Sequence, residues 1–182
     1  MKKLKYFAFA VLVILSASCS SDDDNSGSNN ENNITVGESV YEMKTAIVEP
    51  SIGNTVYLSL TNSTEAEVTA SLNGTMLNNV DLFFARINTP DLTPNGTYNL
   101  SEISSLEFVV NGNFINAEFE NGFSQFYKSG SNADLEVTSG SITVADYDVD
   151  AISLSFSFTR ADGEEITGTY EGAYLYLSSD DE

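Results

Sequence analysis

The chain has 182 residues, with 7 Lys and Arg against 27 Asp and Glu, which gives a formal net charge of −20. Affinity for phosphate backbones comes from Lys and Arg, so such an acidic chain is not expected to bind nucleic acid. It has no His and a single Cys, which removes the commonest metal ligand and general base and excludes an internal disulfide.

The first eighteen residues have the three parts of a secretory signal peptide. Lys2, Lys3 and Lys5 give a positive start, an apolar run follows from residue 6 to 15, and small residues come next. A run of this length is too short to span a bilayer, which takes about 20 apolar residues. We predict that residues 1–18 are removed on export. Ordinary cleavage near Ser18, which would leave a free thiol, is the alternative.

The segment from Leu15 to Cys19 resembles the lipobox of bacterial lipoproteins. In that family the Cys sulfur receives a diacylglyceryl group, the peptide is cut before the Cys, and the new amine is usually acylated. The resemblance implies that Cys19 is lipidated and that the protein contacts a membrane through this N-terminal anchor. The chain has no other Cys, which agrees with that role.

Residues 19–33 are expected to form a lipidated, disordered, acidic tether, because residues 20–33 offer no apolar side chain to a core. The start of this tether resembles the acidic stretch behind the lipidated Cys of many surface lipoproteins of the Bacteroidota, where it directs export to the outer leaflet. The residues that carry this resemblance are Ser20, Ser21, Asp22, Asp23 and Asp24. It implies a lipid-anchored protein on the outer membrane that faces the cell surface. A solvated linker, with the domain on the periplasmic face, is the alternative.

Residues 34–182 are expected to form one all-β domain, an antiparallel β-sandwich or barrel. Apolar and polar residues alternate, turn signals punctuate the chain, and no segment shows a convincing helical period. We predict eight to ten strands. The first are expected at residues 40–48, 55–60 and 68–72, and the last of these leads into a hairpin at Asn73-Gly74.

The middle of the chain is predicted to continue this pattern. A strand is expected around residues 81–87, followed by an irregular loop over 88–96 that contains Pro90 and Pro94. Strands over 106–110 and 114–119 flank Asn111-Gly112-Asn113, a predicted hairpin. Asn121-Gly122 is a further hairpin signal before a strand over 123–128.

The end of the chain gives the clearest pattern. Ile152, Leu154, Phe156 and Phe158 alternate with Ser residues, which predicts a strand with one buried and one wet face. With strands over 141–145 and 165–177 it is expected to form a three-stranded meander, in which two glycines mark bulges or bends, Gly168 and Gly172.

This C-terminal part also resembles uncharacterised β-rich lipoproteins of flavobacteria. The segments that carry the resemblance are residues 93–98, 139–144, 152–159 and 165–172. It implies no activity.

Calcium is the first chemistry to consider in so acidic a chain. Asp146, Asp148 and Asp150 have the spacing of the first ligands of an EF-hand loop. The pattern then fails, because Ala151 replaces the required Gly and Ser157 replaces the bidentate Glu. We therefore predict a hairpin loop whose acids face water, and no metal site.

Catalysis is not expected. Glycoside hydrolysis needs two carboxylates about 5–10 Å apart, and the acids in predicted strands are Glu107, Glu118 and Glu120. The alternation places Glu107 on the solvent side of its strand. A Ser or Thr nucleophile would need a base, but His is absent, and Lys44 and Lys128 lie in no motif.

Aromatic residues are the remaining candidates for a binding site. One group lies between residues 83 and 127, and Tyr170, Tyr174 and Tyr176 share one face of the last predicted strand. Core packing is the simplest interpretation. A lined pocket or an exposed stacking platform for a sugar or a lipophilic molecule is the alternative. The chain has no Trp, the residue favoured for stacking on sugars, which weakens the carbohydrate version.

We therefore expect a non-catalytic outer-membrane lipoprotein with a binding or structural role, and no cofactor. Two alternatives remain open, a lipocalin-like carrier of a small apolar ligand and, less favoured, a carboxylate-dependent hydrolase. The partners left open are a small apolar ligand, a glycan or an envelope protein.

Overall fold

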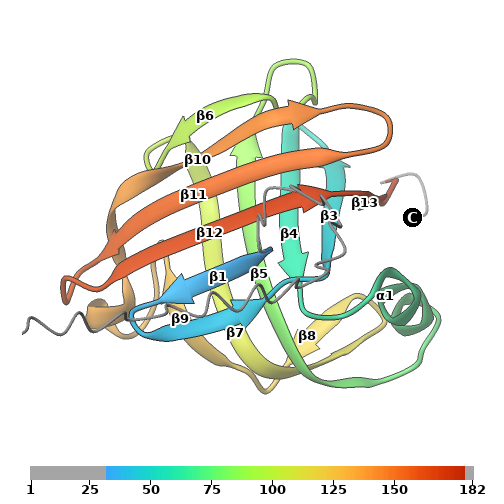
Figure 1. Cartoon of the computed structure of the whole chain (residues 1–182), viewed down its shortest axis with the longest axis horizontal. Helices are drawn as coiled ribbons and strands as arrows, with labels where there is room; N and C mark the ends of the chain where they lie inside the picture. The colour runs from blue at the N-terminus through green and yellow to red at the C-terminus, as the bar shows by residue number, and fades with distance from the viewer. Residues whose placement is uncertain (1–31, 179–182) are drawn as a thin grey trace, which may run out of the picture.

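The computed structural model describes residues 32–178, and these form two β-sheets packed face to face (Figure 1). The strands of one sheet run across those of the other at a steep angle, as in orthogonally packed sandwiches. The predicted all-β class is confirmed. Hydrogen bonding does not close the two sheets into one barrel, so the sandwich is the predicted architecture that forms.

The first sheet has six antiparallel strands and supplies one side of the core. Along its most regular strand, apolar residues are buried and the Ser residues between them lie toward solvent. In spatial order its strands are β2 (Ser39–Glu42), β1 (Asn33–Val36), β12 (Glu165–Gly172), β11 (Ile152–Arg160), β10 (Val137–Tyr147) and β6 (Gly96–Asn99).

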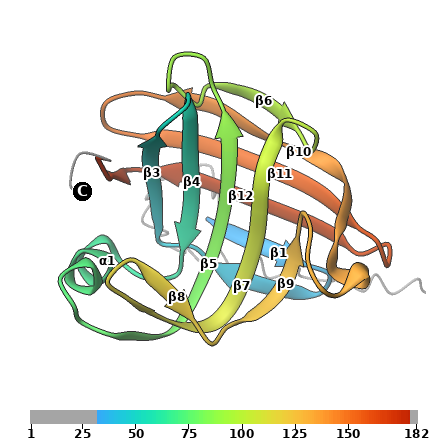
Figure 2. The same cartoon turned by 180° about the vertical axis from the view of Figure 1, so that it is seen from behind.

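The second sheet lies nearer the viewer in Figure 2. All its pairings are antiparallel except that of its first strand with the next. Its strands are β13 (Tyr174–Tyr176), β3 (Thr45–Ser51), β4 (Thr55–Thr61), β5 (Leu77–Asn88), β7 (Ile103–Ile115) and β8 (Glu118–Glu120), and β9 (Phe123–Tyr127) also pairs with β7. Outside the sheets lie helix α1 (Glu65–Leu72) and a 3₁₀ turn, η1 (Ala133–Leu135).

Aromatic rings fill the space between the sheets. Phe83 of β5 stacks on Phe156 of β11 with ring centroids 4.5 Å apart and planes 12° from parallel. Phe126 and Phe158 make a second contact between the sheets at 6.3 Å. Phe83, Phe126 and Phe158 are almost wholly buried, so the simplest interpretation, core packing, is confirmed for these rings.

Gly168 does not form the predicted bulge. β11 and β12 pair in unbroken register, with Gly168 opposite Phe156. A Cβ at Gly168 would lie 2.2 Å from Cζ of Phe156, far inside van der Waals contact. The glycine therefore makes room for the ring that stacks across the core.

The predicted meander is confirmed for β10, β11 and β12, but the last strand ends earlier than expected. The chain leaves the first sheet after Gly172, and Tyr174–Tyr176 pair in parallel with β3 of the second sheet. The hydroxyl of Tyr170 donates to the carbonyl of Ala173 at 2.7 Å and holds this crossing. The alternation of Tyr residues continues across the break, which is why the sequence suggests one strand.

The strand predicted over residues 68–72 is wrong, because residues 65–72 form α1. Thr64 caps this helix. Its hydroxyl accepts the N–H of Glu67, and the Glu67 carboxylate accepts the N–H of Thr64 at 2.8 Å. This reciprocal pair is a capping box. Asn73 and Gly74 end the helix and do not form the predicted hairpin.

The hairpin predicted at residues 111–113 is also wrong. β7 runs through these residues, and its register with β5 shifts there. Asn111 has a φ of +55°, and its N–H donates to Asp81 Oδ1 at 2.9 Å. The true turn is at Asn116 and Ala117, both with positive φ. Bulges and tight turns both need residues that tolerate positive φ, so Asn-Gly pairs mark either.

Asn121-Gly122 likewise does not make a hairpin. β8 and β9, on either side of it, both pair with the same edge of β7, so the pair lies at a break between two segments of one edge. A Cβ at Gly122 would lie 2.3 Å from Cγ1 of Val109. The close approach of β7 at this break therefore requires glycine.

The N-terminal part of the domain also differs from expectation. The single strand predicted over residues 40–48 is two strands in different sheets. The backbone N–H of Met43 donates to the carbonyl of Asn32, next to β1 of the first sheet. The backbone N–H of Lys44 donates to the carbonyl of Thr61, in β4 of the second sheet. Asn32 and Asn33, assigned above to the tether, belong to the fold. The Asn32 side chain exchanges two hydrogen bonds with the backbone of Glu171.

The ring stack between the sheets gives a direct stability test. We expect Phe156→Ala to lower the free energy of unfolding by about 3–5 kcal/mol, because it removes a buried ring and leaves a cavity. Phe123→Ala makes the same deletion at a ring that is 68% exposed, so it should cost far less. Urea unfolding of both variants measures this, and equal losses would contradict the packing described.

Candidate functional site

The candidate site is a surface hollow of about 460 Å³ at β7, β9 and the loop that follows them. It brings together an acid, a cation and several hydroxyl groups. We call it the serine hollow, and it is lined by residues 104–107, 124 and 127–131, five of which are Ser.

Glu107 is the acid of the hollow. It lies on the outer face of β7, as the alternation predicts, because Leu106 and Phe108 on either side are buried. It is half-buried, and its Oε1 accepts the hydroxyl of Ser124 on the neighbouring strand at 2.5 Å. A carboxylate has about four lone-pair positions, so most of its accepting capacity is left for a ligand.

Lys128 is the cation of the hollow. Its ammonium donates to the carbonyl of Leu100 at 3.0 Å and to the carbonyl of Ile103. Its backbone N–H donates to Leu106 O at 2.9 Å. An ammonium has three N–H donors, so two are committed to the turn before β7 and one remains. The side chain is therefore held in place.

The loop over residues 128–132 is fixed by Tyr127. The Tyr127 hydroxyl donates to Asn132 O at 2.7 Å and accepts the Asn132 N–H. Gly130 lies against the ring, and a Cβ there would be 2.3 Å from two ring carbons. The loop thus closes on Tyr127 only because residue 130 has no side chain.

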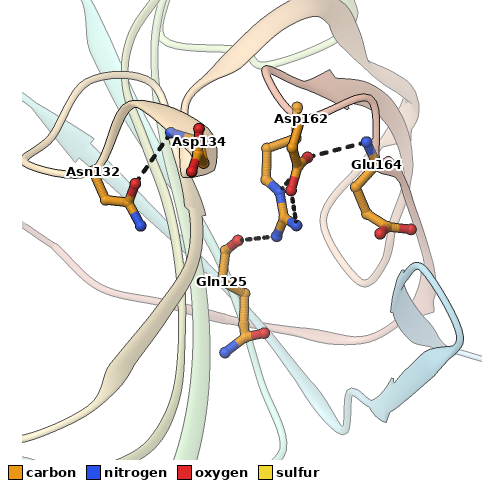
Figure 3. Close-up of polar contacts among 6 residues, drawn as sticks. Gln125, Asn132, Asp134, Asp162 and Glu164 are labelled. Atoms are coloured by element: carbon orange, nitrogen blue, oxygen red, sulfur yellow. Dashed lines mark hydrogen bonds and ion pairs between the residues drawn. The ribbon is translucent and has the colours of Figure 1, made fainter.

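Arg160 ties the hollow to the first sheet. Figure 3 labels two of the residues that its guanidinium contacts, Asp162 and, on β9, Gln125. It donates to Asp162 at 2.9 and 2.6 Å and to the carbonyl of Gln125 at 2.8 Å. Asp162 also accepts the N–H of Glu164 at 3.1 Å. Hydrogen bonds from Arg160 and then from Glu164 lower the pKa of Asp162 to about 2.

Lys44 differs from the other three cations among residues 32–178, because its side chain holds neither an aromatic ring nor a backbone carbonyl. Arg86 lies over the ring of Tyr57 at 5.4 Å, while Lys128 and Arg160 hold backbone carbonyls. Lys44 is exposed and lines two other hollows beside the start of α1. Those hollows also contain Glu42 and Glu65, and their hydroxyls come from Thr and Tyr residues and not from Ser.

The acids considered from sequence do not come together. Glu118 and Glu120 of β8 are exposed, away from Glu107. Asp148 accepts the N–H groups of Asp150 and Ala151, each at 2.9 Å, and so shapes its own turn. Within residues 32–178, no three His, Cys, Asp or Glu side chains are placed to hold a metal ion.

The sequence did not point to the serine hollow. Its hydroxyls come from β7, β9 and the following loop, and isolated Ser residues carry no spacing signal. Phe123 is the exposed ring of the aromatic group, and it does not line the hollow. The export residues, from Cys19 through Ser20 and Ser21 to Asp22, Asp23 and Asp24, lie outside the described residues.

Comparisons with family models, with curated proteins and with solved structures find no match. Among residues 32–178, no helix is both long and apolar enough to cross a membrane. The side chains that line the hollow can form hydrogen bonds with the hydroxyl groups of a ligand. Glu107 is the only carboxylate among its lining residues, and the carboxylate of Glu136 lies at its edge, where it accepts the N–H of Gly130 at 3.3 Å.

The Arg160–Asp162 pair gives a pH test. The lowered pKa of Asp162 means that its contribution to stability is present above its unfolded pKa, near 4, and is lost as pH falls through about 2. Asp162→Asn should therefore be less stable than the parent at pH 7, and the difference should disappear near pH 2. Urea midpoints across this range measure it. A difference that is the same at both pH values would contradict the ion pair.

Proposed function

We propose that this chain is a non-catalytic binding module of the cell envelope, held on the outer membrane by a lipid on Cys19 and facing the cell surface. The observation that carries the proposal is the position of the only Cys, directly behind a signal-type segment. A polar stretch follows, and Asn32, the first residue that the structure describes, already bonds to the backbone of Glu171. Two or three acyl chains anchor a protein firmly, since each buried methylene contributes about 0.8 kcal/mol.

The filled interior favours surface binding over the carrier alternative. A carrier needs a cavity of roughly 300 Å³ or more between its sheets. Here Phe83 and Phe156 stack at 4.5 Å in that position, and their neighbours Phe108 and Phe126 are fully buried. The serine hollow, by contrast, opens on the outer surface. A ligand would therefore bind at the outer surface, without entering the core.

The arrangement of acids favours binding over hydrolysis. Glycosidases use two carboxyl groups facing each other across the scissile bond. Glu107 is the only carboxylate that lines the serine hollow, and it accepts a hydrogen bond from the hydroxyl of Ser124.

Lipidation is tested by Cys19→Ser. We expect this variant to move from the membrane fraction to the soluble fraction and to lose incorporation of a palmitate analogue, because the acylated sulfur is gone. Ser26→Ala, a substitution in the same polar stretch, should leave both unchanged. Membrane retention of Cys19→Ser after a carbonate wash would contradict the anchor.

Surface exposure is tested at the acidic stretch. Replacing Asp22, Asp23 and Asp24 with Ala should lower the digestion of the protein by protease added to intact cells, because the export signal is removed. The matched control replaces Asn25, Asn29 and Asn30 with Ala, which makes the same number of changes without altering charge. If the two variants are digested equally, the acidic stretch does not direct export.

A further inference from the structure

We propose that the serine hollow binds an uncharged saccharide through its hydroxyl groups. The inference deepens the proposed function, since it names the ligand class of a module exposed outside the cell. It rests on three properties of the hollow, which are its balanced charge, its unused hydrogen-bonding groups and its fixed shape.

The charge of the hollow selects against ions. Glu107 and Lys128 are the only charged residues among those that line it, and their charges offset each other. A further carboxylate, that of Glu136, lies at its edge and accepts the N–H of Gly130 at 3.3 Å. An anionic ligand would meet Glu107 in a chain with a net charge of −20, and a cationic ligand would meet Lys128. An uncharged ligand avoids both repulsions.

The unused hydrogen-bonding groups match a polyol. Ser105, Ser129 and Ser131 make no side-chain hydrogen bond to another described residue, and each hydroxyl can donate and accept. One oxygen of Glu107 accepts nothing, and one N–H of Lys128 is uncommitted. These groups include both donors and acceptors. Neighbouring sugar hydroxyls, each both donor and acceptor, complement such a set.

The hollow is formed before any ligand arrives. Tyr127 fixes the loop at Asn132, Lys128 fixes the turn at Leu100 and Ile103, and Ser124 fixes Glu107. A site held in this way loses little freedom on binding. This matters for a sugar, whose hydroxyls must give up water and gain only modest net energy from each new hydrogen bond.

The test uses the full chain, isotope-labelled and purified from whichever cell fraction contains it. Hexasaccharides of glucose (α-1,4, β-1,4 and β-1,3 linked), mannose and xylose are added to about 10 mM, well above a Kd of 1 mM. An oligogalacturonate and a chitosan hexamer serve as the anionic and cationic counterparts. Amide NMR signals of Ser124, Ser129, Gly130 and Ser131 report binding at the hollow.

We expect at least one neutral hexasaccharide to shift these signals in a saturable way and more strongly than either charged oligomer. Glu107→Gln should weaken that binding at least about tenfold, because it replaces a charged acceptor while the amide oxygen can still accept from Ser124. Glu118→Gln, on exposed β8, should leave the affinity unchanged.

The proposal is overturned if no neutral saccharide shifts these signals, if a charged oligomer binds as tightly, or if Glu107→Gln binds like the parent. The readout does not depend on where the protein resides. Failure here would leave the lipid anchor standing, and failure of the Cys19→Ser test would leave saccharide binding standing.

Discussion

The contact between Phe83 and Phe156 is the interaction on which the fold depends. It joins the two sheets within the core, beside further ring contacts between them, Phe126 with Phe158 and Tyr41 with Phe108. The sequence accommodates it at Gly168, whose missing side chain receives the ring. Since the rings occupy the interior, chemistry that the domain performs must be sought on its outer surface.

The outer surface is organised by the few cations of an acidic chain. Arg160 reaches from the end of β11 to the backbone of β9, and Lys128 holds the turn that leads into β7. These two positive charges therefore hold neighbouring segments together and are less available to anions. At the serine hollow, Tyr127 holds the loop and Lys128 holds the turn, and this is why its shape is fixed while several of its hydroxyls stay unused.

Much of the sheet structure could be predicted from the sequence. The strand Ile152–Arg160 was predicted because one face of it is uniformly apolar. α1 was not, because only Val68 and Ser71 of its residues are buried, so no apolar stripe marks it. The overlooked signal was the capping box at Thr64 and Glu67. The hairpin predicted at Asn111-Gly112 is wrong because a bulge and a hairpin turn use the same backbone conformation. The serine hollow could not be predicted, since tertiary structure alone brings its residues together.

The proposed function depends on one atom outside this domain, the sulfur of Cys19. If Cys19 is acylated, the domain works outside the cytoplasm as a tethered module, and the serine hollow faces whatever the envelope presents. The most direct measurement is the intact mass of the mature protein, followed by fragmentation of its N-terminal peptide. The account predicts a chain that begins at Cys19 with a diacylglyceryl group on the sulfur. A mature chain with an unmodified Cys19 thiol would contradict it.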